Sequence, residues 1–225
     1  MSIRQTIGAA LLRNLKPGLV LQAFALLILA IYFWVPASQP LFSRVAQWKA
    51  DYGFAYSFTS TAFFGGLVPF VYLWWSSAFR GRNVLLVAAF YLLFWGTKGM
   101  EVDFFYRLQA DWFGTGNDWQ TLATKVAVDQ FLYSAFWAAP SITLLYLWME
   151  MDWSLSRWWQ ALDRQFLCVK MPTVILSNWL VWIPAVSVVY AMPADLQIPL
   201  FNLVLCFWVL MLAVLNRRES ATSAS

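Results

Sequence analysis

The sequence predicts an all-α fold, a polytopic transmembrane helical bundle of about six spans with one amphipathic surface helix. The first observation is composition, because 61% of the 225 residues are hydrophobic and only 12% are charged. An average soluble domain has roughly 45–50% apolar and about 25% charged residues, so this chain lacks the polar surface of a soluble globule. The second is that the apolar residues form long uncharged runs, which must be helical because lipid offers the backbone no hydrogen-bond partner.

Several runs are apolar enough to be candidate spans. In chain order they are Leu19–Pro36, Phe54–Phe79, Asn83–Thr97, Gln130–Met149, Met171–Ala194 and Leu196–Asn216. A helix needs roughly 20 apolar residues to cross the hydrocarbon layer, and Asn83–Thr97 is the run that falls well short. We therefore expect its helix to continue into the charged stretch behind it, or to lie partly buried in protein.

The distribution of basic residues predicts the orientation. With the N-terminus inside, the segments on that side hold twice as many Lys and Arg residues as the segments outside. Because Lys and Arg are enriched on the cytoplasmic side, we expect both termini inside. Omitting the short third span would break this pattern, which favours keeping it. Tryptophans at the ends of runs, such as Trp34, Trp74 and Trp148, are typical of an interfacial belt.

The connections are short, and the sequence predicts one transmembrane domain over residues 1–218. A tight turn around Gly81 joins the second and third spans. Asp152–Phe166 interleaves Trp and Leu with charged residues, which predicts a helix lying flat on the inner surface. Tyr106–Trp112 is a similar, smaller candidate on the outer surface. The polar tail Glu219–Ser225 is predicted to be disordered.

One group of polar residues lies in or beside the later spans. Lys125, Asp129 and Gln130 lie at the start of the fourth span, and Asn178 lies inside the fifth. Ionisable groups at membrane depth are costly and tend to be functional, so one interpretation is a polar lining of a solute path in which Asp129 attracts cations. Another is an interfacial ion pair of Lys125 and Asp129, with Lys125 reaching outwards. For Asn178, the alternative is a hydrogen bond between helices.

A second polar group follows the third span and consists of Lys98, Glu101, Asp103 and Arg107. Spacings of three and four residues allow the first two and the last two to neutralise each other. The simpler interpretation is a solvated helix end. The alternative is the rim of an outer vestibule that selects charge before a solute enters.

A stripe of small residues marks the second span, where Ser57, Thr61 and Gly65 recur every four residues. Such stripes let helix backbones approach closely in membranes. We expect a packing seam within the chain. A homo-oligomer formed through the same three residues is the alternative.

Prolines interrupt three predicted spans at Pro69, Pro140 and Pro184. Each removes a backbone hydrogen bond and favours a kink, because proline has no N–H and its ring collides with the preceding turn. A kinked helix can widen a bundle near its middle, as a channel requires. Irregular packing explains the prolines equally well.

The C-terminal half carries a family resemblance. The residues that carry it are Lys125, Asp129, Gln130, Pro172, Asn178, Trp179 and Pro184. They form a K-x-x-x-D-Q motif and a proline-bounded Asn-Trp run that resemble motifs of the twenty-two-kilodalton peroxisomal membrane protein family, also called Mpv-seventeen-like. The resemblance covers residues 120–216, and Met171 and Ile175 depart from the family pattern. It implies a membrane protein of organelles or bacteria that forms a weakly selective channel for small solutes.

The chemistry of the chain indicates no enzyme. It has no His, which removes a common general base and metal ligand, and its two Cys cannot form a zinc site of the usual kind. We expect no cofactor, no metal and no nucleic-acid partner, since the net charge of +4 is better explained by membrane orientation. The expected partners are the lipid bilayer and small solutes or ions.

Two functions follow as hypotheses. The first is a weakly selective channel or pore for small solutes or ions, and the alternative is a non-catalytic structural or assembly protein that organises partners or lipids. The basic flank before Leu19–Pro36 resembles a signal peptide, but the run is too long, so we expect it to be retained as a span. The bacterial cytoplasmic membrane is the preferred location, with the mitochondrial inner or the peroxisomal membrane as the alternative.

Overall fold

The computed structural model describes the backbone of residues 3–222 and the side chains of residues 5 and 8–211. The chain is 89% helical, and residues 3–222 contain no strand, which confirms the predicted all-α class. The α-helices are α1 (Ile3–Trp34), α2 (Gln39–Thr61), α3 (Val68–Trp75), α4 (Val84–Phe113), α5 (Trp119–Ala127), α6 (Ala139–Glu150), α7 (Leu155–Ala161), α8 (Met171–Tyr190) and α9 (Ala194–Thr222). The other helical segments are the 3-10 turn η1 (Pro36–Ser38) and the π-helical segments η2 (Ala62–Leu67), η3 (Val128–Ala138) and η4 (Phe166–Lys170).

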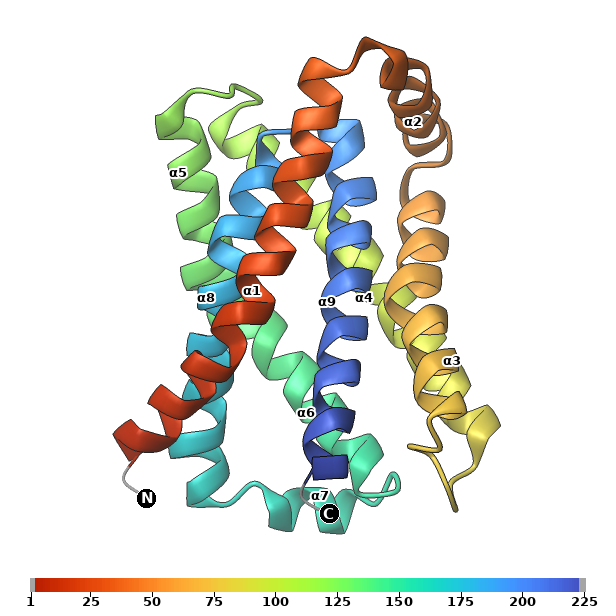
Figure 1. Ribbon diagram of the computed structural model, residues 1–225, viewed down its shortest axis with the longest axis vertical. Coiled ribbons are helices and arrows are strands. Elements are labelled where there is room, and N and C mark those ends of the chain that lie inside the picture. The colour runs from red at the N-terminus through yellow and green to blue at the C-terminus, as the bar shows by residue number, and fades with distance from the viewer. Residues whose placement is uncertain (1–2, 223–225) are drawn as a thin grey trace.

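Six helical stretches within the described residues are long and apolar enough to cross a membrane. They are Gly8–Trp34, Pro36–Trp75, Val84–Phe113, Trp119–Glu150, Phe166–Tyr190 and Ala194–Met211. Figure 1 shows them side by side along the long axis, except for the first part of α2, which turns away at the top and is separated from the rest of its stretch by the non-helical Gly53. The start of α1, the end of α9 and the short helix α7 lie at the same end of the bundle. Because hydrocarbon tolerates only backbones that satisfy their own hydrogen bonds, this architecture is that of a multi-pass integral membrane protein.

The third span confirms one prediction and corrects another. Its helix α4 continues from Val84 through the charged stretch to Phe113, as the short apolar run required. The separate outer surface helix predicted for Tyr106–Trp112 is therefore wrong. These residues form the last turns of α4, and Tyr106 is buried because other helices cover it. Gly114, with φ of 82°, ends the helix in a conformation that favours glycine.

Local signals fix several helix ends. Asn83, Asp118 and Ser154 each accept a hydrogen bond from the backbone N–H three residues further on, which satisfies a free donor at the start of α4, α5 and α7. The predicted surface helix is present as α7, shorter than the segment Asp152–Phe166, and lies across the end of the bundle in Figure 1. At the other terminus α9 continues to Thr222. The rest of the tail predicted to be disordered, residues 223–225, lies outside the described residues.

Three prolines each follow a π-helical segment. Pro69, Pro140 and Pro172 are the second residues of α3, α6 and α8, and the residue before each donates its N–H to the carbonyl five residues back. These donor and acceptor pairs are Val68 and Phe63, Ala139 and Ser134, and Met171 and Phe166. In the wider π turn, the backbone carbonyl that would otherwise collide with the proline ring lies further from the ring. Pro184, in contrast, lies inside α8.

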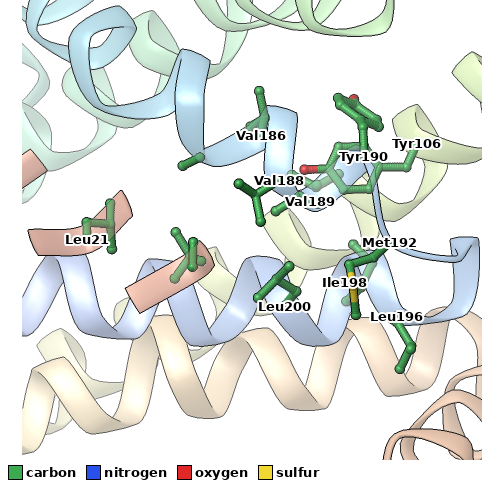
Figure 2. Close-up of a cluster of buried hydrophobic side chains, with 14 of the residues drawn as sticks. Leu21, Tyr106, Val186, Val188, Val189, Tyr190, Met192, Leu196, Ile198 and Leu200 are labelled. Carbon is green, nitrogen blue, oxygen red and sulfur yellow. The ribbon is translucent and has the colours of Figure 1, made fainter. Parts of the chain in front are cut away.

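The interior contains two clusters of apolar side chains that both include α9. The larger lies between α1, α4, α8 and α9 and includes the fully buried Leu21, Val189 and Val204. Figure 2 shows its α8 and α9 side chains facing each other. The smaller surrounds Phe70 and Tyr91 where α3 and α4 meet α9. Both clusters therefore use α9 as a central helix, and the other spans pack around it.

The small-residue stripe of α2 and η2 packs within the chain. Ser57 and Thr61 are fully buried, and a Cβ added to Gly65 would come within 2.7 Å of Leu205 and 3.2 Å of Trp95. The stripe thus brings this span close to α4 and α9, as such stripes do in membranes. The three residues face the chain's own helices, and a homo-oligomer through Ser57, Thr61 and Gly65 stays a prediction.

Candidate functional site

A cavity of about 400 Å³ lies within the membrane-spanning part of the fold. Its walls come from α3, α4, η3, α6, α8 and α9. Asp129, Gln130, Ser134 and Asn178 form a polar end, and much of the remaining lining is aromatic. The aromatic residues include Tyr91, Trp95, Tyr146, Trp182, Phe201 and Trp208. This central cavity falls within the range of roughly 300–1,000 Å³ that is typical of small-molecule sites.

Asp129 is the buried carboxylate of the central cavity and is 4% exposed. Its Oδ2 accepts a hydrogen bond of 2.7 Å from the Tyr190 hydroxyl, and its Oδ1 accepts one of 2.7 Å from Gln130 Nε2. The Tyr190 hydroxyl in turn accepts from Gln109 Nε2. Among the described side chains, no Lys or Arg forms an ion pair with Asp129.

The predicted ion pair of Lys125 and Asp129 does not form. Both side chains face Tyr190, as their shared helix face required, but the tyrosine satisfies them separately. Its hydroxyl binds Asp129, and its ring centroid lies 5.9 Å from Lys125 Nζ. The carboxylate thus has only neutral hydrogen-bond donors, which leaves its charge uncompensated by a local cation.

Asn178 joins the fifth span to the polar end of the cavity. Its Nδ2 donates to Ser134 Oγ at 2.8 Å and to Gln130 Oε1 at 3.4 Å. The neighbouring Trp179 Nε1 donates to the Gln130 backbone carbonyl at 2.7 Å. The motif residues of the fourth and fifth spans therefore lie together, and Asn178 both lines the cavity and bonds between helices. The two interpretations of Asn178 are compatible.

The Lys98–Glu101 pair forms near the middle of α4, as its spacing predicted. Lys98 Nζ lies 2.8 Å from Glu101 Oε1 and also donates to Ser141 Oγ at 2.8 Å. Glu101 Oε1 further accepts from the Tyr133 hydroxyl at 2.6 Å and from Trp137 Nε1 at 2.9 Å. Lys98 lines the central cavity and is 6% exposed, so a solvated helix end is wrong for this pair. Glu101 compensates its charge.

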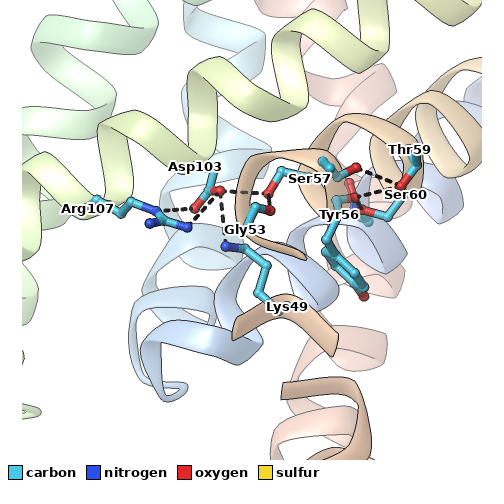
Figure 3. A network of polar contacts seen from close by, with 10 residues as sticks. Lys49, Gly53, Tyr56, Ser57, Thr59, Ser60, Asp103 and Arg107 are labelled. Carbon is cyan, nitrogen blue, oxygen red and sulfur yellow. Dashed lines mark hydrogen bonds and ion pairs between the residues drawn. The ribbon is translucent and has the colours of Figure 1, made fainter. Parts of the chain in front are cut away.

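Asp103 lies at the centre of a second polar cluster, which Figure 3 shows between α4 and α2. It pairs with Arg107 Nε at 3.1 Å, as its spacing predicted, and with Lys49 Nζ at 3.0 Å. Ser57 Oγ donates to its Oδ2 at 2.7 Å. Asp103 is 3% exposed, whereas the Arg107 side chain is 51% exposed, so the solvated helix end applies to Arg107 and not to Asp103.

The four residues predicted as one outer rim belong to two places. Asp103 and Arg107 line an outer cavity of about 310 Å³, together with Lys49 and Asp195. Lys98 lines the central cavity instead, because α4 turns the two pairs towards different neighbours. The rim interpretation therefore applies to the second pair alone.

Tyr106 lines both the outer and the central cavity. It is 5% exposed, and its ring centroid lies 4.9 Å from that of Tyr190, the partner of Asp129. Tyr106 carries no signal in the sequence, since a tyrosine near a span end is usual at a membrane interface. Lys49 carries none either because it lies between two predicted spans, and Tyr190 carries none because its partner Asp129 is far along the chain.

The fold and the site define a class: a polytopic α-helical membrane protein with an uncompensated carboxylate in an internal cavity. The described residues contain no group of three or more His, Cys, Asp or Glu side chains placed to hold a metal ion. No protein family, no curated protein and no solved structure matches this chain. The resemblance carried by Lys125, Asp129, Gln130 and the following motif therefore stays a prediction.

Proposed function

We propose that the protein is a channel for small solutes that favours cations and is closed in this conformation at Tyr106. The observation that carries the proposal is that Tyr106 lines both the outer cavity of about 310 Å³ and the central cavity of about 400 Å³. Two cavities that share one lining side chain are candidate parts of a gated path, since pores combine polar linings with constrictions.

The charges support cation selection in the central cavity. Lys49 and Arg107 are balanced in the outer cavity by Asp103 and Asp195. In the central cavity Lys98 is balanced by Glu101, whereas Asp129 has no cationic partner. A solute that reaches Asp129 therefore meets a net negative wall, which favours cations over anions.

The closure at Tyr106 is coupled to Asp129 through Tyr190. The Tyr106 ring packs on the Tyr190 ring, and the Tyr190 hydroxyl donates to the carboxylate. Opening requires Tyr106 to turn away from this position, and the packing on Tyr190 opposes that rotation. A cation at Asp129 would share the carboxylate oxygen that binds Tyr190 and weaken that hydrogen bond, which links occupancy of the cavity to the closed arrangement.

Solute efflux from reconstituted liposomes tests the proposal. Tyr106→Ala should raise efflux because it removes the separating ring, and Tyr106→Phe, which keeps the ring, is the matched control. Asp129→Asn should reduce the preference for cations over anions while leaving neutral solutes unaffected. If neither the wild type nor Tyr106→Ala exceeds protein-free vesicles, the channel proposal fails.

The competing proposal is a non-conducting protein that organises partners or lipids. Its support is α7, where Leu155 and Trp159 are 67% and 72% exposed at one end of the bundle. This proposal predicts a stoichiometric partner in gentle purification. Replacing Trp159 with Ser should then release the partner without changing solute efflux.

A further inference from the structure

We infer that the central cavity binds an organic cation with an apolar body, such as a quaternary ammonium ion carrying an aromatic or alkyl group. The inference deepens the proposed function by naming its substrate class, and transport of the cation rests on that function. Binding does not, because it stands on three properties of the cavity: an uncompensated carboxylate, a wall of aromatic rings, and a volume suited to a small molecule.

The charge of the cavity is the first property. Asp129 and Lys98 are the charged side chains in its lining. Lys98 Nζ lies 2.8 Å from Glu101, which compensates it, and Lys125 lies outside the lining over the Tyr190 ring. With Glu101 included and Asp129 ionised, the cavity carries one net negative charge. A buried charge is stabilised by a partner of opposite sign, and a bound cation supplies that partner.

The hydrogen bonds of Asp129 leave room for such a cation. Each carboxylate oxygen accepts one hydrogen bond from a neutral donor, Tyr190 at Oδ2 and Gln130 at Oδ1. An ionised carboxylate has about four acceptor positions, so roughly half of them remain. The two existing donors fix the orientation of the carboxylate before a ligand arrives, which lowers the entropic cost of binding.

The aromatic wall begins beside Asp129 and continues along the cavity. The Tyr106 ring centroid lies 4.9 Å from that of Tyr190 and 6.4 Å from that of Phe201, and Phe201 lies 5.6 Å from Trp182. The faces of such rings attract cations, and the attraction strengthens when water is excluded. A row of rings next to an anionic end therefore suits one cationic group and one apolar body.

The same wall disfavours small inorganic cations. Beyond its polar end the cavity is lined mainly by Tyr, Trp, Phe and aliphatic side chains, which offer few oxygen ligands. A hydrated metal cation would have to shed water without replacement, and that desolvation is costly. A quaternary ammonium ion spreads its charge over several carbons and carries no tightly held water, so the rings can replace its solvent.

Binding of phenyltrimethylammonium to the full chain in detergent tests the inference. Its uncharged isostere tert-butylbenzene has the same shape and lacks only the charge. We expect the cation to bind at least about tenfold more tightly than the isostere, measured by titration of tryptophan fluorescence and by thermal unfolding. Sodium chloride at matched ionic strength serves as the probe for inorganic cations and should not shift the unfolding temperature.

Two variants locate the site. Asp129→Asn should weaken cation binding about tenfold or more and leave isostere binding unchanged, whereas Asp51→Asn, which removes an exposed carboxylate on α2, should leave both unchanged. Trp182→Leu keeps an apolar wall and removes a ring face, so it should weaken the cation more than the isostere. If Asp129→Asn fails to fold, Trp182→Leu still tests whether the aromatic wall binds the cation.

The outcomes separate the inference from the channel proposal. Equal binding of cation and isostere, absence of cation binding, or cation binding unaffected by both Asp129→Asn and Trp182→Leu each overturns the inference. Cation binding that depends on Asp129 without any liposome efflux supports the inference and removes the channel. Efflux without such binding supports the channel and removes the inference.

Discussion

Replacing Asp103 with Leu is expected to cause a large loss of stability. The carboxylate pairs with Lys49 at 3.0 Å and Arg107 at 3.1 Å and accepts a hydrogen bond from Ser57 at 2.7 Å. The Arg107 side chain is 51% exposed and can turn to solvent, but the Lys49 side chain is 3% exposed and cannot. Removing one partner of a buried pair costs about 3–5 kcal/mol, and the lost Ser57 bond adds about 1 kcal/mol. The two terms together give an expected loss of about 4–6 kcal/mol.

The double replacement shows whether the buried ammonium causes this loss. Lys49→Met alone should cost about 1–2 kcal/mol, because Asp103 keeps Arg107 and Ser57 as partners. The double variant Lys49→Met with Asp103→Leu leaves neither charge buried, and it should be more stable than Asp103→Leu alone. We expect a coupling free energy of about 2 kcal/mol. The assay is reversible unfolding in mixed micelles with increasing sodium dodecyl sulfate, followed by circular dichroism.

A surface ion pair supplies the control. Asp152 pairs with Arg157 at 3.2 Å, and both side chains are more than half exposed. Arg157→Leu, which removes this pair at a helical position of α7, should therefore cost about 0–1 kcal/mol. If Asp103→Leu costs no more than Arg157→Leu, or if the two single losses simply add, then Lys49 is not buried against Asp103 as described.

Two further predictions concern packing and pH. Gly66→Ala should cost about 2 kcal/mol in the same unfolding assay, because the added Cβ would lie 2.7 Å from the Tyr91 backbone oxygen, while Gly8→Ala, with nothing within 4 Å, should be neutral or stabilising. Hydrogen bonds from the Thr121 N–H and hydroxyl lower the pKa of Asp118 below its ordinary 3.8. The cap therefore stabilises the start of α5 above that ordinary value and loses this effect as pH falls through the lowered one. Hydrogen exchange of the Thr121 amide, corrected for the intrinsic rate at each pH, should become faster at low pH in the wild type. The exchange of Asp118→Asn should not change in this way. The same pH dependence in both proteins would contradict the cap.

The spans could be predicted from the sequence because the constraint on them is local. A bilayer of fixed thickness and a backbone without outside partners require long apolar helices, and these appear in composition alone. The same reasoning extended the short run Asn83–Thr97 into α4. It failed at Tyr106–Trp112, where mixed polarity resembled a surface helix. Tyr106 and Gln109 instead contact Tyr190 of α8, and a single segment cannot reveal such a partner.

The site could be predicted only in part, for a related reason. The pairs Lys98–Glu101 and Asp103–Arg107 follow from helical spacing, so they were found. Spacing also put Lys125 and Asp129 on one face, but Tyr190, 61 residues beyond Asp129, takes the carboxylate instead. A partner so distant along the chain leaves no periodic signal. Burial on a helix face is readable in sequence, whereas the identity of the facing side chain is not.

The π-helical segment η3 shows how a local irregularity builds the cavity wall. Residues at every fourth position line the cavity through this span, namely Gln130, Ser134, Ala138, Ile142 and Tyr146. In an α-helix, positions four apart advance about 40° beyond a full turn, so such a row would leave the cavity within a few turns. In the wider π turn they fall short of a full turn, and the drift has the opposite sign. The π-helical η3 is followed directly by the α-helical α6, which contains Pro140 in its first turn. The rotation of the row in η3 therefore offsets its opposite rotation in α6, and one face lines the cavity from the polar end to Tyr146.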